Sequence, residues 1–316
     1  MREMHLVANE LMKIYKRKTL WVMVAILAVV VIIMAAAILK NTPDHDNWKS
    51  ELQKQNVEMT QSLNDKQVPK EAKEAVLPQV KENQYRLDHN IPPLFSDTVF
   101  GFMKTTGDLV SVLIGVFVVI IGGSIVSQEY SWGTIKLLMI RPIKRWKILL
   151  SKFIAVIVTG IFFIALGFLL QLIVGALFFG FDMGPGKYLY LKDNTVHIVS
   201  MGTHFLQYYA SSLVDVIIMA TFAFMLSTIF KTNALAIGLS IFLSLAGPIV
   251  VSLLSYVNEN IAKYLFFLNT DLYQFVEGPT LLKDTTLAFS ACVLVVYFAI
   301  FLIVSFLIFN KRDIAE

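Results

Sequence analysis

The sequence predicts an all-α fold: a polytopic membrane helical bundle with six transmembrane helices, an N-terminal interfacial helix and a small extracellular helical hairpin. Of its 316 residues, 56% are hydrophobic and only 16% are charged, whereas a soluble domain carries about 25% charged residues. The apolar residues gather in six runs, each long enough to cross a membrane as a helix. Helices are expected because lipid offers the backbone no other hydrogen-bond partner. The six runs are residues 20–39, 109–126, 153–179, 208–230, 234–257 and 287–309.

Residues 1–19 predict an amphipathic helix that lies along the cytoplasmic membrane interface. Apolar side chains recur at helical spacing through Met4, Val7 and Leu11, and a basic stretch follows them. The next run, residues 20–39, has that basic flank and three successive alanines, which loosely resemble a signal-peptide cleavage site. The run is too long for a typical signal peptide, so we expect it to remain as the first transmembrane helix.

Residues 40–108 predict a polar extracellular segment, because they are too charged to enter lipid. A helical stripe runs through Trp48, Leu52, Met59 and Leu63, and a weaker stripe follows it, so we expect a small helical hairpin. The charges of this hairpin are expected mainly to keep it in water. A role in binding a substrate or a partner is the alternative.

Two further outer segments are predicted, at residues 180–207 and 258–286. The first opens with glycines and a proline and is expected to be a flexible loop. The second contains the apolar stretch 264–268, which is too short to span, so we expect a re-entrant or interfacial segment. Gly247-Pro248 lies inside the fifth run and should kink that helix.

The positions of the lysines and arginines predict the orientation of the bundle. With the N-terminus inside, the inner segments hold 14 of these residues and the two short outer loops hold 4. Both termini, including the tail 310–316, are therefore expected in the cytoplasm, with the bundle in a cell membrane, the bacterial plasma membrane. The basic residues flank apolar spans, and this placement indicates membrane lipid as a partner and not nucleic acid.

The cytoplasmic segment 127–152 carries the main functional signal. Pro142 divides it into two short helical pieces, each with an apolar face. One interpretation is a loop whose basic residues set the topology and contact lipid phosphates. The other is a docking element for a cytoplasmic partner, because an acidic residue, a glycine and an apolar helix face suit a groove in another protein.

The same segment contains, in order, Glu129, Gly133-Thr134, Leu137-Leu138, Arg141-Pro142, Lys144-Arg145 and Lys152. This series resembles the signature of ABC-2-type permeases, the membrane subunits of one class of bacterial ATP-binding-cassette exporters. The family commonly has a small residue where Arg141 stands and a small or polar residue where Lys144 stands, and these departures bear on fine specificity. The resemblance extends to the architecture, with its N-terminal interfacial helix, six spans and large first outer loop.

The resemblance implies that a coupling helix near residues 129–140 sits in a groove of a separate ATP-binding-cassette ATPase subunit. It also implies a second permease chain, alike or different, with the transport pathway between the two. ATP and Mg²⁺ would be bound by the ATPase, so this chain is expected to bind no cofactor itself. The residues expected to dock against the ATPase are Glu129, Trp132, Gly133, Thr134, Leu138, Arg141 and Pro142.

We expect no catalytic residue and no metal site in this chain, and we do not expect it to be an enzyme. The nearest approach to a Walker A sequence, Gly184-Pro185-Gly186-Lys187, lacks the upstream glycine and is followed by Tyr188. The five histidines are scattered, and the one cysteine, Cys292, lies in an apolar run. ATP hydrolysis is therefore expected to belong to another chain.

Two polar residues inside the predicted spans are candidates for a translocation path. Asp215 lies in the fourth run and Gln171 in the third. A carboxyl group in a span usually faces the bundle interior or water. The alternative for both residues is a hydrogen-bonded contact between helices, and for Asp215 also a position near the outer surface.

Three functions stay open on the sequence. The first is a permease subunit of an ABC transporter, exporting a lipid, peptide, antibiotic or ion. The second is an ion-coupled secondary transporter, for which Asp215 is the supporting residue. The third is a membrane sensor or assembly protein that acts through its outer hairpin. Only the first requires an ATPase bound to residues 127–152.

Overall fold

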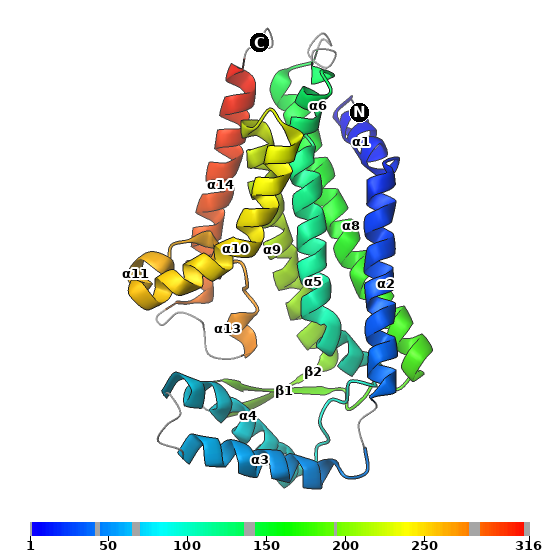
Figure 1. Cartoon of the computed structure of the whole chain (residues 1–316), viewed down its shortest axis with the longest axis vertical. Coiled ribbons are helices and arrows are strands. Elements are labelled where there is room, and N and C mark those ends of the chain that lie inside the picture. The colour runs from blue at the N-terminus through cyan, green and yellow to red at the C-terminus, as the bar shows by residue number, and fades with distance from the viewer. Residues whose placement is uncertain are drawn as a thin grey trace.

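A computed structural model describes residues 2–41, 45–64, 70–135, 143–192, 195–277 and 285–312. Within these residues, six helices are long and apolar enough to cross a membrane (Figure 1). They confirm the predicted all-α bundle of a multi-pass membrane protein. The six helices are α2 (Lys18–Lys40), α5 (Val99–Ser124), α8 (Arg145–Phe179), α9 (Met201–Ile229), α10 (Asn233–Val257) and α14 (Leu287–Lys311).

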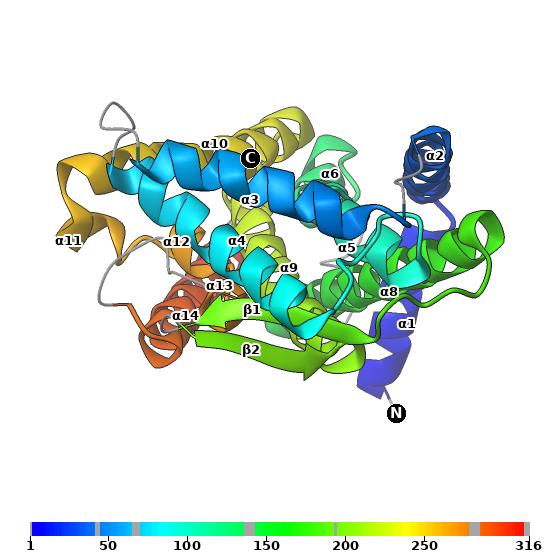
Figure 2. The ribbon, with the colours of Figure 1, turned by 90° about the horizontal axis from the view of Figure 1, so that it is seen from below.

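Helix α5 lies at the centre of the bundle and packs most extensively against α9 and α8. Figure 1 shows α1 (Arg2–Tyr15) and the end of α14 at one end of the molecule, which we call the terminal end. Helices α3 (Trp48–Asn64) and α4 (Lys70–His89) lie at the other, which we call the hairpin end. Figure 2 looks onto the hairpin end, where these two helices and a two-stranded sheet cover the bundle.

The burial pattern of α2 explains how an almost wholly apolar helix is oriented. Its buried residues recur every three or four positions, at Leu20, Met23, Leu27, Val31 and Ala35, which places them on one face. Its other large apolar side chains are exposed, as at Trp21, Val29 and Ile33, or only half-buried. Because lipid tails are as apolar as leucine, packing and not hydrophobicity selects the inward face.

The helix α1 that precedes α2 is amphipathic, as predicted. Ile14 is buried and Met4 is exposed, and α1 packs against α8 as well as α2. The predicted hairpin of residues 40–108 is also present as the antiparallel pair α3 and α4. Asn56 of α3 donates a hydrogen bond of 3.2 Å to the carbonyl of Val80 in α4, which joins the two helices.

Three of the spanning helices begin earlier than their apolar runs. Helix α5 begins at Val99 and not at residue 109, α8 at Arg145 and not at 153, and α9 at Met201 and not at 208. In α5 the earlier turns contain Lys104 and Asp108, and in α8 they contain Lys152. A charged residue ends an apolar run in a hydropathy analysis. The helix nevertheless continues through these residues, because their side chains have polar partners within the protein.

The segment 180–207 contains a β-hairpin where we expected only a loop. Strand β1 (Lys187–Lys192) pairs antiparallel with β2 (Thr195–Ser200). Both strands are rich in β-branched and aromatic residues, the composition that favours strands. We expected a loop because of the glycines and the proline that precede these strands. Strand β1 packs against α4 and so attaches the helical hairpin to the bundle.

Helix α10 changes direction part-way along (Figure 1), as Gly247-Pro248 predicted. Proline cannot donate to the carbonyl of Ser244 one turn earlier. A Cβ at Gly247 would lie 2.5 Å from the ring of Phe267, so glycine permits this close approach. The chain then continues through three short helices where a re-entrant segment was predicted: α11 (Glu259–Ala262), α12 (Phe266–Asn269) and α13 (Gln274–Glu277).

The contact between α5 and α9 depends on Gly122. A Cβ there would lie 3.0 Å from the carbonyl oxygen of Ala220, so Gly122→Val is expected to force the two helices apart. Overpacking of this kind costs about 1–3 kcal/mol. The matched control is Gly115→Val in the same helix, where a Cβ meets nothing within 4 Å. Thermal melting of the purified variants in detergent checks this, and equal melting temperatures would contradict the close packing.

Candidate functional site at the terminal end

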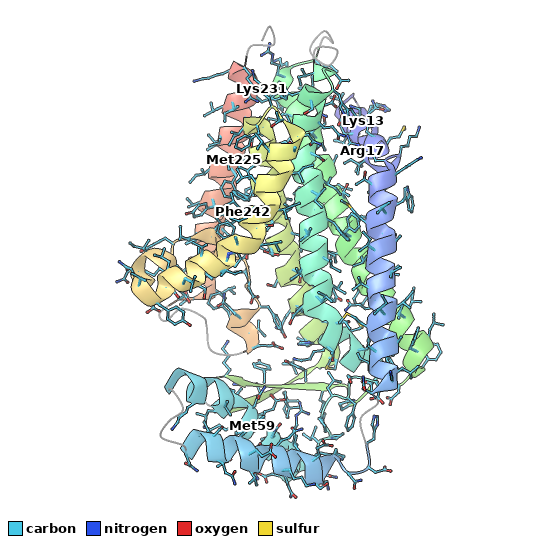
Figure 3. The ribbon with its side chains drawn as sticks, viewed as in Figure 1. Lys13, Arg17, Met59, Met225, Lys231 and Phe242 are labelled. Carbon is cyan, nitrogen blue, oxygen red and sulfur yellow. The ribbon has the colours of Figure 1, made fainter. Side chains whose placement is uncertain are left out.

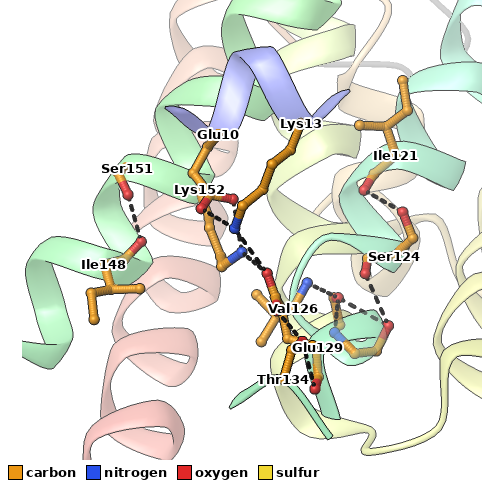
Figure 4. Close-up of polar contacts among 12 residues, drawn as sticks. Glu10, Lys13, Ile121, Ser124, Val126, Glu129, Thr134, Ile148, Ser151 and Lys152 are labelled. Carbon is orange, nitrogen blue, oxygen red and sulfur yellow. Dashed lines mark hydrogen bonds and ion pairs between the residues drawn. The ribbon is translucent and has the colours of Figure 1, made fainter. Parts of the chain in front are cut away.

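A buried cluster of charged side chains joins three helices at the terminal end (Figure 4). We call Glu10, Lys13, Glu129, Thr134 and Lys152 the charge cluster. Lys152 of α8 is only 1% exposed. Its Nζ lies 2.8 Å from Oε2 of Glu10 in α1 and 2.9 Å from Oε1 of Glu129 in α6 (Ser127–Ser131). One ammonium group therefore bridges two carboxylates from distant parts of the chain.

Lys13 and Thr134 complete the charge cluster. Nζ of Lys13 lies 2.8 Å from Oε1 of Glu10 and 3.3 Å from Oε1 of Glu129. The hydroxyl of Thr134 donates a hydrogen bond to the carboxylate of Glu129. Two lysines thus face two glutamates, and the cluster is neutral overall, so the attraction between opposite charges can offset the cost of removing them from water.

Serine hydroxyls fix the short helix α6 to the end of α5. Oγ of Ser227 in α9 accepts hydrogen bonds of 3.0 Å from the backbone N–H groups of Val126 and Ser127. The hydroxyl of Ser127 donates to the carbonyl of Gly123 at 2.8 Å. These bonds satisfy backbone groups at the junction of the two helices. Glu129 is consequently held at a defined place beside α8.

A glycine in the left-handed backbone conformation terminates α6. Gly133 has a φ of 69°, a conformation that glycine adopts without steric cost at the C-terminal end of a helix. The N–H of Trp132 donates to the carbonyl of Gln128 at 2.9 Å. The turn brings Thr134 back to Glu129 and leaves the indole of Trp132 in the open, 65% exposed.

The carboxylates of the charge cluster stay ionised well below neutral pH. Burial alone would raise the pKa of Glu129, but Lys152, Thr134 and Lys13 outweigh it and lower the pKa to about 2. Burial opposes ionisation of Glu10 in the same way, and Lys152 and Lys13 nevertheless lower its pKa. Lys13 keeps its proton because the two glutamates raise its pKa more than burial lowers it.

The predicted docking residues fall into two sets in the described part of the chain. Glu129 and Thr134 point inward and hold α6 in place, whereas Trp132 and Gly133 lie at the surface. The side chain of Glu129 is therefore occupied within this chain. The remaining predicted docking residues, Leu138, Arg141 and Pro142, lie outside the described residues.

Three members of the charge cluster were not among the predicted docking residues: Glu10, Lys13 and Lys152, of which Lys152 was named only in the signature series. Glu10 is buried, and it stands three residues after Val7 and four before Ile14 on the apolar face of α1. An acidic residue in that register is the sequence signal that points to a buried cationic partner. The partner's identity required the fold, because 142 positions separate Glu10 from Lys152.

The two candidate path residues lie in different surroundings. Gln171 is buried and bonded within the bundle: its Nε2 donates to Oγ1 of Thr106 at 2.7 Å, and the hydroxyl of Tyr209 donates to its Oε1 at 2.8 Å. It therefore joins α8, α5 and α9. Asp215 lines a cavity of about 440 Å³ between α5, α9 and the segment 270–277. Of the two, Asp215 is the one that lines this cavity.

Replacing Glu129 by glutamine is expected to remove part of the acid sensitivity of the fold. The pKa of Glu129 is lowered from 4.5 to about 2, so its ionised form stabilises the fold above about pH 4.5, and this stabilisation is lost as the pH falls toward about 2. Thermal melting between about pH 6 and about pH 3 checks this. The melting temperature should fall more steeply for the unmodified protein than for Glu129→Gln. The control is Glu58→Gln on the exposed face of α3. If the melting temperature depends on pH equally in Glu129→Gln and in the unmodified protein, the ion pairing of Glu129 does not stabilise the fold as described.

Comparison with known proteins identifies relatives along the whole chain. The chain is 38% identical to the uncharacterized protein YhcI of Bacillus subtilis (strain 168) over 319 residues, covering 99% of this chain and 100% of YhcI. It is 28% identical to the uncharacterized membrane protein YdbK of the same organism over 219 residues, covering 69% of this chain and 84% of YdbK. This likeness agrees with a multi-pass membrane protein.

A family model described as "Protein of unknown function (DUF2705)" matches residues 77–315. The matched range contains Glu129, Lys152 and Asp215, and the similarity to YhcI extends over nearly all of this chain. Since the model matches more than half of the chain, the protein belongs to the DUF2705 family.

Proposed function

We propose that this protein is the membrane-spanning permease subunit of an ATP-binding-cassette transporter of the ABC-2 type, and that a separate ATPase docks at its terminal end. The observation that carries the proposal is the charge cluster, which fixes α6 beside α1 and α8 and leaves Trp132 exposed at the surface. The signature residues Glu129 and Lys152 form a direct ion pair in that cluster.

The distribution of charge supports a cytoplasmic terminal end. Figure 3 shows Lys13, Arg17 and Lys231 at this end of the bundle. The inner segments hold 14 lysines and arginines and the two short outer loops hold 4, the bias that places basic loops in the cytoplasm. ATP is available on that side of the membrane, and a soluble ATPase could reach Trp132 there.

The exposed surface of α6 suits a protein partner. Trp132 is 65% exposed, and the guanidinium carbon of Arg17 lies 5.9 Å from the centre of its ring. Exposed tryptophan beside arginine is the composition that dominates binding energy at protein interfaces. The apolar ring would fill a pocket in the partner, and the left-handed Gly133 would let the partner backbone approach closely.

The same surface is connected to the other spanning helices. The guanidinium of Arg312, directly after α14, donates to the carbonyls of Thr228 and Ile229 at the end of α9. Its carbon also lies 5.2 Å from the centre of the Tyr130 ring in α6. A force on α6 would therefore reach α1 and α8 through the charge cluster and α9 and α14 through Arg312. ATP binding on the partner would bias the bundle between two states through these contacts.

In this proposal the ATPase binds ATP and Mg²⁺, and this chain contributes no catalytic group. A second permease chain, identical or different, completes the pathway, and the cargo is a lipid, peptide, antibiotic or ion that is exported. The alternative with support in the geometry is an ion-coupled secondary transporter, because Asp215 lines a cavity. The two are distinguished by whether transport requires ATP.

Replacing Trp132 by alanine is expected to release the ATPase. The tagged protein purified from its native membrane in mild detergent should bring with it a subunit that hydrolyses ATP. Trp132→Ala should lower the recovered ATPase activity about tenfold or more, because a buried aromatic anchor contributes about 2 kcal/mol or more to an interface.

The control is Trp146→Ala, which removes an indole that is 41% exposed at the N-terminal end of α8 and should leave the recovery unchanged. Absence of any ATPase with the unmodified protein, even after cross-linking, would contradict the proposal. Full recovery with Trp132→Ala would contradict the docking site.

A further inference from the structure

The cavity that contains Asp215 has the size of a small-molecule site. Its volume is about 440 Å³, within the range of roughly 300–1,000 Å³ that ligand pockets occupy. Three parts of the chain form its wall: the first half of α5, the first half of α9, and the segment 270–277 that follows the bend of α10. The cavity lies toward the hairpin end, because Lys104 in its wall contacts Tyr188 of β1.

The wall of this cavity carries more negative than positive charge. It contains four carboxylates, Asp108, Asp215, Asp271 and Glu277, against Lys104 and His204. Both of these basic groups are directed at Glu277: Nζ of Lys104 and Nδ1 of His204 each lie 3.5 Å from its Oε1. Lys104 therefore forms an ion pair with one of the four carboxylates, and three remain.

The other three carboxylates form no ion pair with any residue that the structure describes. Asp108 accepts a hydrogen bond of 3.2 Å from the hydroxyl of Tyr208, and Asp271 accepts one of 3.0 Å from the N–H of Tyr273. Asp215 lies within the spanning helix α9, where an acidic group is costly and usually faces water or a ligand. Burial also raises the pKa of Asp271 more than its backbone hydrogen bonds lower it.

The spacing of these groups does not suit a metal ion. Among the described residues, no three of His, Cys, Asp and Glu lie close enough together to hold one. The wall that carries the four carboxylates also carries aromatic rings. Tyr208 and Tyr273 meet edge to face with ring centres 5.5 Å apart, and Phe205 also lines the cavity. A cavity that combines carboxylates with aromatic rings suits an organic cation, through charge attraction and cation–π contact.

We propose that this cavity binds an organic cation, a molecule with an apolar body and at least one positive charge, held by Asp108, Asp215 and Asp271 against the rings of Tyr208 and Tyr273. The binding itself stands independently of the proposed function. The added statement that such cations are the cargo rests on the proposed permease function.

The test is equilibrium binding of tetraphenylphosphonium to the full chain in nanodiscs of zwitterionic phosphatidylcholine, which carries no net charge, without any ATPase. Tetraphenylborate has nearly the same shape and the opposite charge, so it is the matched control ligand. Tetraphenylphosphonium should bind above the level of empty nanodiscs, and tetraphenylborate should not. Asp215→Asn and Asp271→Asn should each raise the Kd for tetraphenylphosphonium about tenfold or more, whereas Glu58→Gln on α3 should leave it unchanged.

Asp215→Glu keeps the charge and should retain binding, which separates loss of the site from loss of the fold. If Asp215→Asn is not recovered as a monodisperse protein, Asp108→Asn replaces it. Equal binding of the two ligands, no binding of either, or unchanged binding by the variants would overturn the proposal. If tetraphenylphosphonium binds in nanodiscs but no ATPase is recovered with the protein from native membranes, the cation site is supported and the permease function is contradicted.

Discussion

Lys152 is the residue on which the terminal end of the bundle depends. Its ammonium group is buried between Glu10 and Glu129, at 2.8 and 2.9 Å. Removing such a group from water costs several kcal/mol, and only close ion pairs with well-placed hydrogen bonds offset that cost. Helices α1 and α6 must therefore sit where their carboxylates reach Lys152. This requirement holds the amphipathic helix α1, the short helix α6 and the spanning helix α8 together as one unit.

The two polar regions of the molecule share the same helices. Helix α5 lines the Asp215 cavity with Asp108 in its first half and leads through Ser127 into α6 at its end. Helix α9 contributes Asp215 to the cavity, and its Ser227 fixes the start of α6. A displacement of α6 by a partner would consequently move the two helices that shape the cavity. This arrangement is what a permease needs, because a docking event on one side must alter a site toward the other.

The sequence predicted the six spans, the helical hairpin and the bend at Pro248, because each follows from local hydropathy, periodicity or the missing N–H of proline. The predicted starts of α5 and α8 were too late in the chain. A hydropathy analysis counts the charges of Lys104 and Lys152, but it does not include the carboxylates that pair with them in the fold. The link between Glu10 and Lys152 and the cavity around Asp215 arise from contacts between helices far apart in the chain. Glu10 was detectable only as an acidic residue on an apolar helix face. The β-hairpin was missed because glycine and proline outweighed its strand-forming residues.

The free energy of unfolding of two variants, measured in detergent, tests most directly whether the charge cluster acts as one unit. Lys152→Met alone should cost about 3–5 kcal/mol, because among the described residues it leaves the two buried carboxylates with Lys13 as their remaining ion-pair partner. Lys152→Met combined with Glu10→Gln and Glu129→Gln should be more stable than Lys152→Met alone, because it removes the uncompensated charges and leaves only the half-exposed Lys13 to solvent. The alternative is that each substitution lowers the free energy of unfolding independently, so that the triple variant is less stable than Lys152→Met. In that case the cluster is not an interdependent unit, and the account of the terminal end is wrong.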